Sequence, residues 1–359
     1  MKIKQATQKF EEWLGRQVEL QADELDYKHQ QMASDDPFPF FRGTYYRWVQ
    51  VWPEACPELQ KGPRVLSVGD LHIENFGTWR DSDARLVWGI NDFDEADDLP
   101  WANDLVRLAS SAWFAIHTGL LEIGFGKACR NILDGYLTQL TGAAEPFVLE
   151  ESHPELRRLA MHEERSPVAF WEKLHAISDQ PKVRDPDMLA ALQRALPETA
   201  TQPVFHRRTH VGMGSLGKPR AVAIAAYNGG AVAREAKALC GPATRWFDKT
   251  PPVASRITEA LSKVIRSPDP LYRTDGAWIV RRLAPHCSRI ELSNLTKNRE
   301  LKCVLKSMGA ETANIHRGSA RKAERISDAV KSLPKDWLEE AAKKVSKVLV
   351  KDWKSWRRS

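Results

Sequence analysis

The sequence lacks the features that mark disulfide-rich, zinc-binding and membrane-spanning proteins. Its five cysteines are odd in number and scattered, without a Cys-x-x-Cys pair, and its histidines show no metal-ligand spacing, so neither a disulfide framework nor a zinc site is predicted. No run of 18 apolar residues occurs, and residues 1–17 form a charged amphipathic stretch without an apolar signal core. We therefore expect a cytoplasmic protein without a membrane span.

The chain also lacks internal repeats and low-complexity segments, and its composition is that of a globular protein. Hydrophobic residues make up 42% of the 359 residues and charged residues 28%, with thirteen tryptophans that we expect largely in the core. This length suffices for one large or two ordinary domains, which suits a bilobal enzyme.

A net charge of +6 favours anionic partners such as nucleotides, phosphorylated metabolites, nucleic acid or a membrane surface. Much of the excess positive charge lies in residues 321–359. The alternative to an anionic partner is that these residues form a solvent-exposed helix face. Nucleic acid is thus a possible partner that the sequence does not favour. The sequence does not indicate the oligomeric state.

The first 200 residues are predicted to be mostly helical. Residues 1–35 have a helical pattern, the segment 34–43 is rich in turn residues, and an extended stretch is expected after it. Residues 104–119 have the apolar spacing of a buried helix, and prolines break several further helices before residue 196.

From Pro203 the sequence alternates β-prone runs with glycine turns, which predicts a small antiparallel sheet with a hairpin at Asn228-Gly229. We then expect a helix over residues 253–266, strands over 271–276 and 278–285, and helices from residue 294 onward. The boundaries at residues 200 and 292 thus divide the chain into three parts.

Two short predicted strands each lead into an acidic loop. The strand at 64–68 precedes GDLHIENFG, which holds Asp70 and Asn75, and the strand at 85–90 precedes NDFDEA, which holds Asp92. A phosphotransferase needs one group that orients the acceptor hydroxyl and hard oxygen ligands for Mg²⁺. Asp70 is the candidate base, and Asn75 and Asp92 are candidate metal ligands. Such residues also cap turns, and this alternative stays open for either loop alone.

Other polar residues of these segments have less definite roles. His72 is grouped with Asp70 as a candidate catalytic residue, although it suits holding the loop better than transferring protons. Asp94 is an additional acid and an alternative metal ligand. Arg42, in FFRGTYYRW, is a candidate phosphate or substrate clamp, because arginine suits bidentate anion recognition; stacking among its aromatic neighbours is the alternative.

A glycine-rich segment, HVGMGSLG, lies between β-prone runs at residues 210–217. The absence of a helix directly after it argues against a Rossmann site. Gly212, Gly214 and Gly217 would let the backbone approach phosphates, and Ser215 could donate a hydrogen bond. A plain hairpin remains the alternative.

The strand after the glycine segment should supply a cation to the phosphates. AVAREAKAL places Arg234 where a kinase-type strand has lysine, and Lys237 is the alternative. Glu259 is a candidate partner for either cation, unless it is simply a surface residue of a helix.

GDLHIENFG resembles the GDxHxxN catalytic-loop motif of aminoglycoside phosphotransferases and choline kinases, and residues 90–109 resemble their metal-binding segment. The resemblance implies that Asp70 is the catalytic aspartate, that Asn75 and Asp92 bind magnesium, and that Asp104 is a structural carboxylate that buttresses the catalytic loop. The choice between Asp92 and Asp94 stays open.

In those kinases the glycine loop comes first, whereas here the carboxylates precede it. The resemblance therefore implies an α+β, bilobal protein-kinase-like (aminoglycoside phosphotransferase-like) fold that is circularly permuted. Chain termini that lie close together can be joined and the chain cut elsewhere while the three-dimensional site is preserved. Residues 1–200 would form the helical catalytic lobe, 201–292 the β-rich nucleotide-binding lobe, and 293–359 helices that pack back on the helical lobe.

The set of motifs also resembles an uncharacterised bacterial family, a domain of unknown function whose members carry them in this inverted order. The expected function is an ATP- and Mg²⁺-dependent phosphotransferase acting on a small hydroxylated acceptor. Alternatives are a nucleotidyl (AMP) transferase, a nucleotide-binding pseudokinase, or a basic module that binds nucleic acid or a membrane surface. The acceptor stays unidentified, because residues 120–196, where its pocket could lie, carry no interpretable motif.

Overall fold

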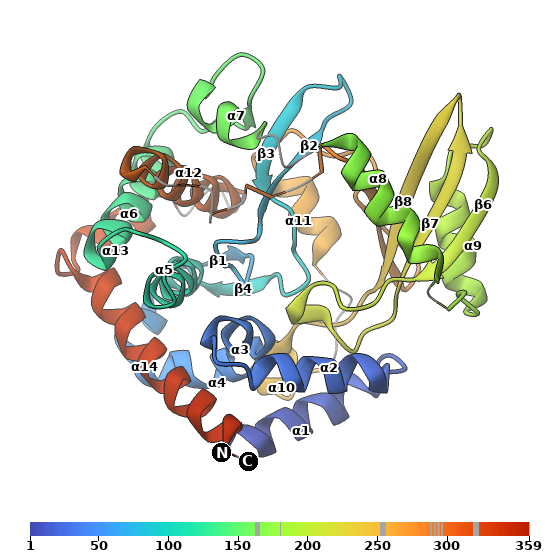
Figure 1. The fold of residues 1–359 in the computed structure, drawn as a ribbon. Coiled ribbons are helices and arrows are strands. Elements are labelled where there is room, and N and C mark those ends of the chain that lie inside the picture. Colours follow the sequence, from blue (N-terminus) through green and yellow to red (C-terminus); the bar gives the residue numbers. More distant parts are fainter. Residues whose placement is uncertain are drawn as a thin grey trace.

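The computed structural model describes residues 1–161, 166–179, 181–251, 256–287, 289–290, 292, 295, 297–318 and 323–358. The protein is a mixed α+β fold with three small sheets (Figure 1). No helix in the described ranges is long and apolar enough to cross a membrane.

The N-terminal segment consists of four helices separated by short turns, and so differs from the expected single helix and extended stretch. It forms α1 (Ile3–Leu14), α2 (Ala22–Met32), α3 (Pro37–Gly43) and α4 (Tyr45–Ala55), followed by the 3₁₀ turn η1 (Pro57–Lys61). The prolines that suggested turns instead begin a helix: the Asp36 side chain accepts a hydrogen bond from the Phe38 backbone nitrogen at 2.8 Å, and Pro37 occupies the first helical turn.

Two small sheets carry the acidic loops. β1 (Arg64–Ser67) pairs with β4 (Asp97–Pro100), whereas β2 (Phe76–Arg80), β3 (Leu86–Ile90) and β5 (Phe147–Val148) form a second sheet. The two short strands predicted before the loops are thus confirmed as β1 and β3. A hydrogen bond from the Asn91 nitrogen to the Asn75 carbonyl, at 3.0 Å, ties the loops together.

The buried helix α5 (Ala102–His117) confirms the helix predicted from residue 104, and further helices pack around it or on its neighbours. They are listed here in chain order: α6 (Phe125–Thr141), α7 (Pro154–Ala160), α12 (Asn298–Arg317), α13 (Ala323–Lys331) and α14 (Trp337–Arg357). The predicted start of the last helical region, residue 294, lies outside the described residues. α6 and α12 cross closely, because a Cβ atom at Gly135 or Gly309 would overlap a backbone carbonyl of the other helix.

The expected antiparallel sheet has five strands in the order β6-β7-β8-β10-β9. These are β6 (Thr201–Arg207), β7 (Arg220–Tyr227), β8 (Gly230–Ala238), β9 (Arg273–Asp275) and β10 (Trp278–Leu283). Asn228 and Gly229 join β7 to β8, both with positive φ, which confirms the predicted hairpin. The sheet therefore forms its own layer beside the helices.

Short helices flank this sheet. α8 (Pro167–His175), continued by η3 (Ala176–Asp179), covers one face and α9 (Pro186–Ala195) the other, so both helices belong with the sheet although they precede residue 200. Between β8 and β9 lie α10 (Ala243–Phe247) and α11 (Ile257–Lys263). The first residues of the helix predicted over 253–266 lie outside the described ranges.

The C-terminal helix α14 runs along the N-terminal helices (Figure 1). It contacts α1, and Trp353 and Trp356 donate hydrogen bonds to the carbonyls of Ser34 and His29, at or just after the end of α2. The two ends of the chain consequently meet on one side of the molecule.

Candidate functional site

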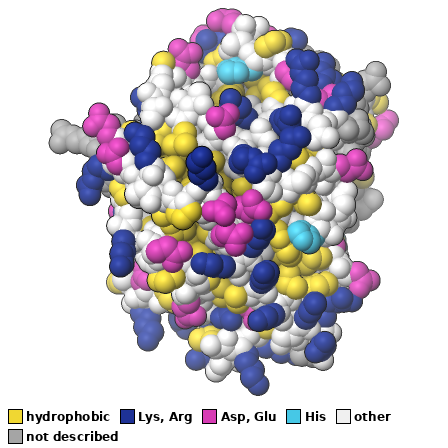
Figure 2. Space-filling model, turned by 90° about the vertical axis from the view of Figure 1, so that its left-hand side faces the viewer, with side chains coloured by type: hydrophobic (Ala, Val, Ile, Leu, Met, Phe, Trp, Pro, Cys, Tyr) yellow, Lys and Arg dark blue, Asp and Glu magenta, His cyan; other side chains and the backbone are white. Residues whose placement is uncertain are grey.

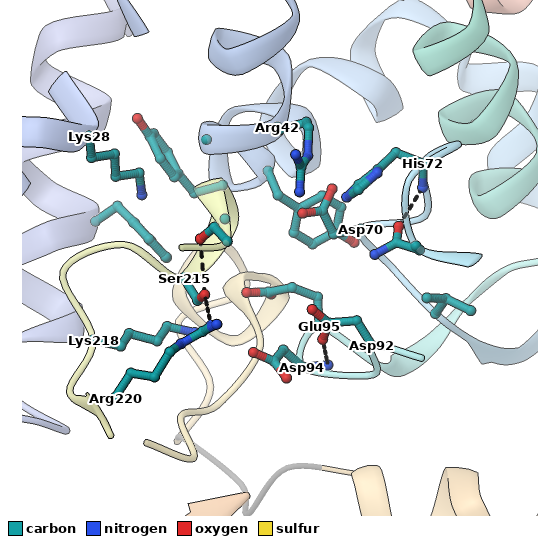
Figure 3. A pocket seen from close by; sticks show the side chains of 18 of the residues that line it. Lys28, Arg42, Asp70, His72, Asp92, Asp94, Glu95, Ser215, Lys218 and Arg220 are labelled. Carbon is teal, nitrogen blue, oxygen red and sulfur yellow. Dashed lines mark hydrogen bonds between the residues drawn. The ribbon is translucent and has the colours of Figure 1, made fainter. Parts of the chain in front are cut away.

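The two acidic loops and the glycine segment enclose one cavity of about 100 Å³ between the helices and the five-stranded sheet (Figure 3). Nine of the residues expected in the site line it: Arg42, Asp70, His72, Asn75, Asp92, Asp94, Gly212, Gly214 and Ser215. The remaining lining comes mainly from α1 to α4, and none of the described residues between 120 and 196 contributes. The structure thus joins motifs that are far apart in the sequence.

Asp70 is held by an arginine that the sequence did not single out. One carboxylate oxygen of Asp70, Oδ1, accepts hydrogen bonds from Nε and Nη2 of Arg107, at 3.0 and 2.6 Å. Arg107 is completely buried, lies 3.7 Å from the centre of the Phe41 ring, and also donates to the Phe41 carbonyl. Burial raises the pKa of Asp70, although the charge of Arg107 opposes this shift. The second oxygen, Oδ2, faces Gly214, where a Cβ atom would lie 3.4 Å away.

The rest of the GDLHIENFG loop is stabilised internally. The Asn75 side-chain oxygen accepts a hydrogen bond from the His72 nitrogen at 2.6 Å, and Nδ1 of His72 accepts one from the Glu74 nitrogen at 3.2 Å. Burial and the charges of nearby arginines lower the pKa of His72 well below its usual value, so the ring is neutral. In this structure Asn75 makes the turn-capping contact, and His72 holds the loop.

Asp104 contacts the backbone at the start of the GDLHIENFG loop. Its fully buried carboxylate accepts hydrogen bonds from the nitrogens of Val68 and Gly69, at 2.7 and 3.1 Å. His316 lies 3.1 Å from the same carboxylate and is hydrogen-bonded through Nδ1 to the Tyr136 hydroxyl at 2.8 Å. This geometry gives Asp104 the contacts that a buttress of the loop requires.

Asp92 and Asp94 share Lys237. Its ammonium group lies 2.6 Å from an Asp94 oxygen and 3.6 Å from Asp92. Burial alone would raise the pKa of Asp92, but Lys237 and a hydrogen bond with Asp94 lower it; burial and the charge of Asp92 raise the pKa of Asp94.

Within the described ranges, no group of three or more His, Cys, Asp or Glu side chains surrounds a common metal position. Two neighbouring carboxylates nevertheless fit Mg²⁺, which needs only one or two carboxylates when phosphates and water supply the other oxygens. Asp92 and Asp94 are therefore the residues that could hold this ion, with Lys237 as their present counter-ion.

The structure distinguishes between Arg234 and Lys237 as the cation that faces the acidic loops. The two residues are three positions apart on β8, and successive side chains of a strand point to opposite faces. Arg234 donates hydrogen bonds to the carbonyls of Ala195 and Ala233, on the α9 side of the sheet. Lys237 points toward the acidic loops, so it is the cation near the site.

Glu259 does not pair with either of these cations. Its carboxylate binds Arg256 and Lys263, each at 2.7 Å, on and beside the short helix α11. These two partners lower the pKa of Glu259 to about 2. The predicted pairing of Glu259 with Arg234 or Lys237 is therefore wrong, because Glu259 belongs to this local charge cluster.

The glycine segment folds into a tight loop between β6 and β7 that includes the 3₁₀ turn η4 (Met213–Ser215). Gly212 and Gly217 have φ values of +73° and +93°, which glycine adopts without strain. The Ser215 hydroxyl donates to the Gly212 carbonyl and accepts from Arg220. Gly217 lies against Leu25 of α2, so this glycine seats the loop on α2 instead of lining the cavity.

Five charged residues of the cavity wall were not among the predicted site residues: Lys28, Glu95, Lys218, Arg220 and Arg281. Lys218 directly follows Gly217 and completes a Gly-x₄-Gly-Lys spacing of the kind that binds phosphates, so a local signal existed. Lys28 is the seventh residue of α2 and carries no such signal. Burial raises the pKa of Glu95 to about 7, and this side chain accepts a hydrogen bond from the Ala243 nitrogen at 2.6 Å.

A second cavity, of about 320 Å³, adjoins the first and shares Gly212, Arg220 and Arg281 with it. Six arginines line it: Arg208, Arg220, Arg266, Arg281, Arg282 and Arg289. Three of them, Arg208, Arg220 and Arg281, surround the fully buried Glu235 and hold its pKa well below the usual range despite its burial. One carboxylate among three guanidinium groups leaves this region positively charged.

Together, the fold and site define an α+β protein whose acidic loops lie beneath a glycine-rich loop. Residues 20–168 match the model of a domain-of-unknown-function family, described as an uncharacterised protein conserved in bacteria. The matched range includes both acidic loops, Arg42 and Asp104, whereas the glycine loop and Lys237 follow it. No curated protein and no solved structure matches the chain.

Proposed function

We propose that this protein is a Mg²⁺- and ATP-dependent phosphotransferase that acts on a small hydroxylated acceptor. The observation that carries the proposal is the convergence of Asp70, Asp92 and the glycine loop on one enclosed cavity. Phosphoryl transfer needs little covalent chemistry from a protein, so carboxylates, cations and a close-fitting loop in these positions suffice.

In this proposal Asp70 orients the acceptor hydroxyl through Oδ2, while Arg107 fixes the carboxylate through Oδ1. Asp92 and Asp94 supply oxygen ligands for magnesium. Bound magnesium would neutralise charge on the phosphate oxygens. Lys237, released from Asp94, would contact the same phosphates.

The larger cavity suits the nucleotide better than the smaller one. Its 320 Å³ lies within the range of about 300–1,000 Å³ that is typical of small-molecule sites. Trp79, Tyr272 and Leu283 offer apolar surface for a base, and Arg220 and Arg281 lie where the two cavities meet. A nucleotide in this position would direct its phosphates toward Asp92.

Transfer of AMP is a second candidate, favoured by the six arginines of the larger cavity. If the β- and γ-phosphates bound there, arginines would stabilise the departing pyrophosphate, and the α-phosphate would lie nearest the acidic loops.

A module that binds nucleic acid or a membrane surface is less favoured by the distribution of basic side chains on the molecular surface. On the face shown in Figure 2, which includes the side where α13 and α14 lie in Figure 1, they are interspersed with acidic and apolar side chains.

Calorimetric titration of ATP, with Mg²⁺ and with EDTA, tests the nucleotide site. We expect Mg²⁺-dependent binding that Asp92→Asn abolishes and that Asp83→Asn, an exposed aspartate in the β2–β3 turn, preserves. Transfer of label from γ-labelled ATP would indicate phosphotransfer, and transfer from α-labelled ATP would indicate AMP transfer. Binding without either transfer would indicate a pseudokinase, and the absence of binding would refute the proposal.

A further inference from the structure

Two lysines of the smaller cavity are buried without a hydrogen-bond or ion-pair partner among the described residues. Lys28, from α2, is 3% exposed, and Lys218, which follows the glycine loop, is 8% exposed. Both line the cavity that contains Asp70. Throughout the described ranges, no hydrogen bond or ion pair joins either ammonium group to another residue, and the closest aromatic ring, that of Tyr46, lies 6.0 Å from Lys28. Burial alone would lower the pKa of Lys218, but the charges of nearby groups, Asp94 and Glu95 among them, raise it.

Two further donors that line the same cavity are buried and unsatisfied. The Tyr45 hydroxyl and Nε of Arg42 have no hydrogen-bond partner among the described residues. Burying a cation or a polar hydrogen without a partner costs free energy. Burial lowers the pKa of Lys28 to about 8, although the charges of Glu11, Glu95 and Asp70 oppose the shift. The cavity wall therefore combines four donor groups that lack an acceptor.

We propose that Lys28 and Lys218 bind a phosphate group of the acceptor, so that the acceptor is a phosphorylated hydroxy compound. This inference rests on the proposed phosphotransferase function. A phosphate group offers several acceptor oxygens and forms charge-assisted hydrogen bonds with lysine and arginine. Tyr45 would donate to the same group, which the cavity of about 100 Å³ can enclose, whereas Arg42 lies beside Asp70 and His72 (Figure 3).

The position of Lys28 favours the acceptor over the nucleotide, whereas Lys218 lies beside Arg220, where the two cavities meet (Figure 3). In Figure 3, Lys28 and Lys218 lie on one side of the cavity, with Asp70 and His72 on the other. Lys28 comes from α2, whereas the arginine-lined cavity reaches the site from β10 and the start of β7. A phosphate held between the lysines would place the attached hydroxyl compound next to Asp70, across from a nucleotide in the larger cavity.

A stability measurement separates this role from a structural one. Lys28→Met removes an unpaired buried charge, so we expect it to raise the melting temperature in phosphate-free buffer while it weakens binding of the anion. If Lys28 only stabilised the fold, its replacement by methionine would instead lower the melting temperature.

The test titrates inorganic phosphate into the wild type and into Lys28→Met and Lys218→Met, by calorimetry and by the shift in melting temperature. We expect the wild type to bind phosphate and each variant to bind it at least about tenfold more weakly. Lys9→Met is the matched control, because Lys9 is an exposed lysine of α1 and its loss changes the net charge equally. Lys218→Met provides the answer if Lys28→Met does not fold.

Unchanged phosphate binding in both variants, or no binding to the wild type, would overturn the inference. Competition between phosphate and Mg-ATP for one site would also overturn it, because the lysines would then serve the nucleotide. Lysine-dependent phosphate binding without any ATP binding would support the phosphate site and refute the proposed phosphotransferase function. ATP binding that persists in Lys28→Met, together with lost phosphate binding, would support both.

Discussion

Arg107 donates two hydrogen bonds to the same oxygen of Asp70, and the other oxygen of that carboxylate faces the glycine loop. The arginine is fully buried, whereas the aspartate side chain is 17% exposed. Asp70 therefore balances a buried charge and also presents an oxygen to the cavity.

Removing Asp70 should destabilise the protein. Asp70→Ala leaves the Arg107 guanidinium buried without its partner, which costs about 3–5 kcal/mol in the free energy of unfolding. The double variant Asp70→Ala/Arg107→Met should recover much of this loss, as urea denaturation would show. Asp275→Ala, which breaks the more exposed pair with Arg194, should cost no more than about 1 kcal/mol. Equal losses in both single variants would contradict the buried-pair account.

Asp70→Asn should separate binding from turnover. The amide keeps the shape of the side chain but cannot accept a proton or orient a hydroxyl as a carboxylate does. We expect Mg-ATP to bind as in the wild type while the rate of label transfer falls by about 10²–10⁴-fold. Full activity of the purified variant would exclude Asp70 as the group that orients the acceptor.

Lys237→Met and Arg234→Met should behave differently. Lys237 faces the acidic loops, so its loss should weaken Mg-ATP binding by about tenfold or more. Arg234 binds the Ala195 carbonyl on the other face of the sheet, so its loss should lower stability by about 1–3 kcal/mol and leave ATP affinity unchanged. Calorimetry and urea denaturation of both variants measure these effects, and the opposite pattern would reverse the assignment of the phosphate-binding cation.

Glu311 should make stability depend on pH. Burial raises its pKa from 4.5 to about 7, so the folded protein binds this proton more tightly than the unfolded chain does. The resulting stabilisation is complete below about pH 4.5 and is lost as the pH rises through 7, with a change on the order of 3 kcal/mol. The stability difference between wild type and Glu311→Gln, measured by urea denaturation across this range, should follow that curve. A difference that does not vary with pH would show that Glu311 titrates normally.

Gly309→Ala should disrupt the crossing of α6 and α12. The added methyl group would overlap the backbone carbonyl of Ile132, and backbone cannot move as a side-chain end can. We expect a loss of about 3 kcal/mol or more in the free energy of unfolding. Gly124→Ala is the control, because nothing lies within 4 Å of a Cβ atom there; similar losses in both variants would refute the close crossing.

Local patterns predicted β1, β3, α5 and the hairpin at Asn228-Gly229, because strand alternation, helical apolar spacing and turn chemistry are encoded within a few residues. They failed at α3, where Pro37 resembled a turn residue but begins a helix capped by Asp36. Distinguishing a proline inside a first helical turn from one in a loop requires knowledge of what the helix packs against.

The site was predictable to the extent that its residues lie in short motifs. Asp70, Asp92 and the glycines could be named from the sequence, whereas the contact of Asp70 with Arg107 joins residues on separate elements and left no local pattern. The alternation of side chains along β8 could have placed Lys237 and Arg234 on opposite faces, because three positions separate them.

The hydrogen bond from Trp353 to Ser34 also has a consequence for synthesis of the protein. The two residues are 319 positions apart, so α2, which carries Lys28, leaves the ribosome long before the helix that packs behind it. Until α14 has been translated, the N-terminal helices expose apolar surface that the finished protein buries. This wall of the cavity therefore forms only after most of the chain has been translated, and the apolar surface exposed until then is open to chaperones and to aggregation.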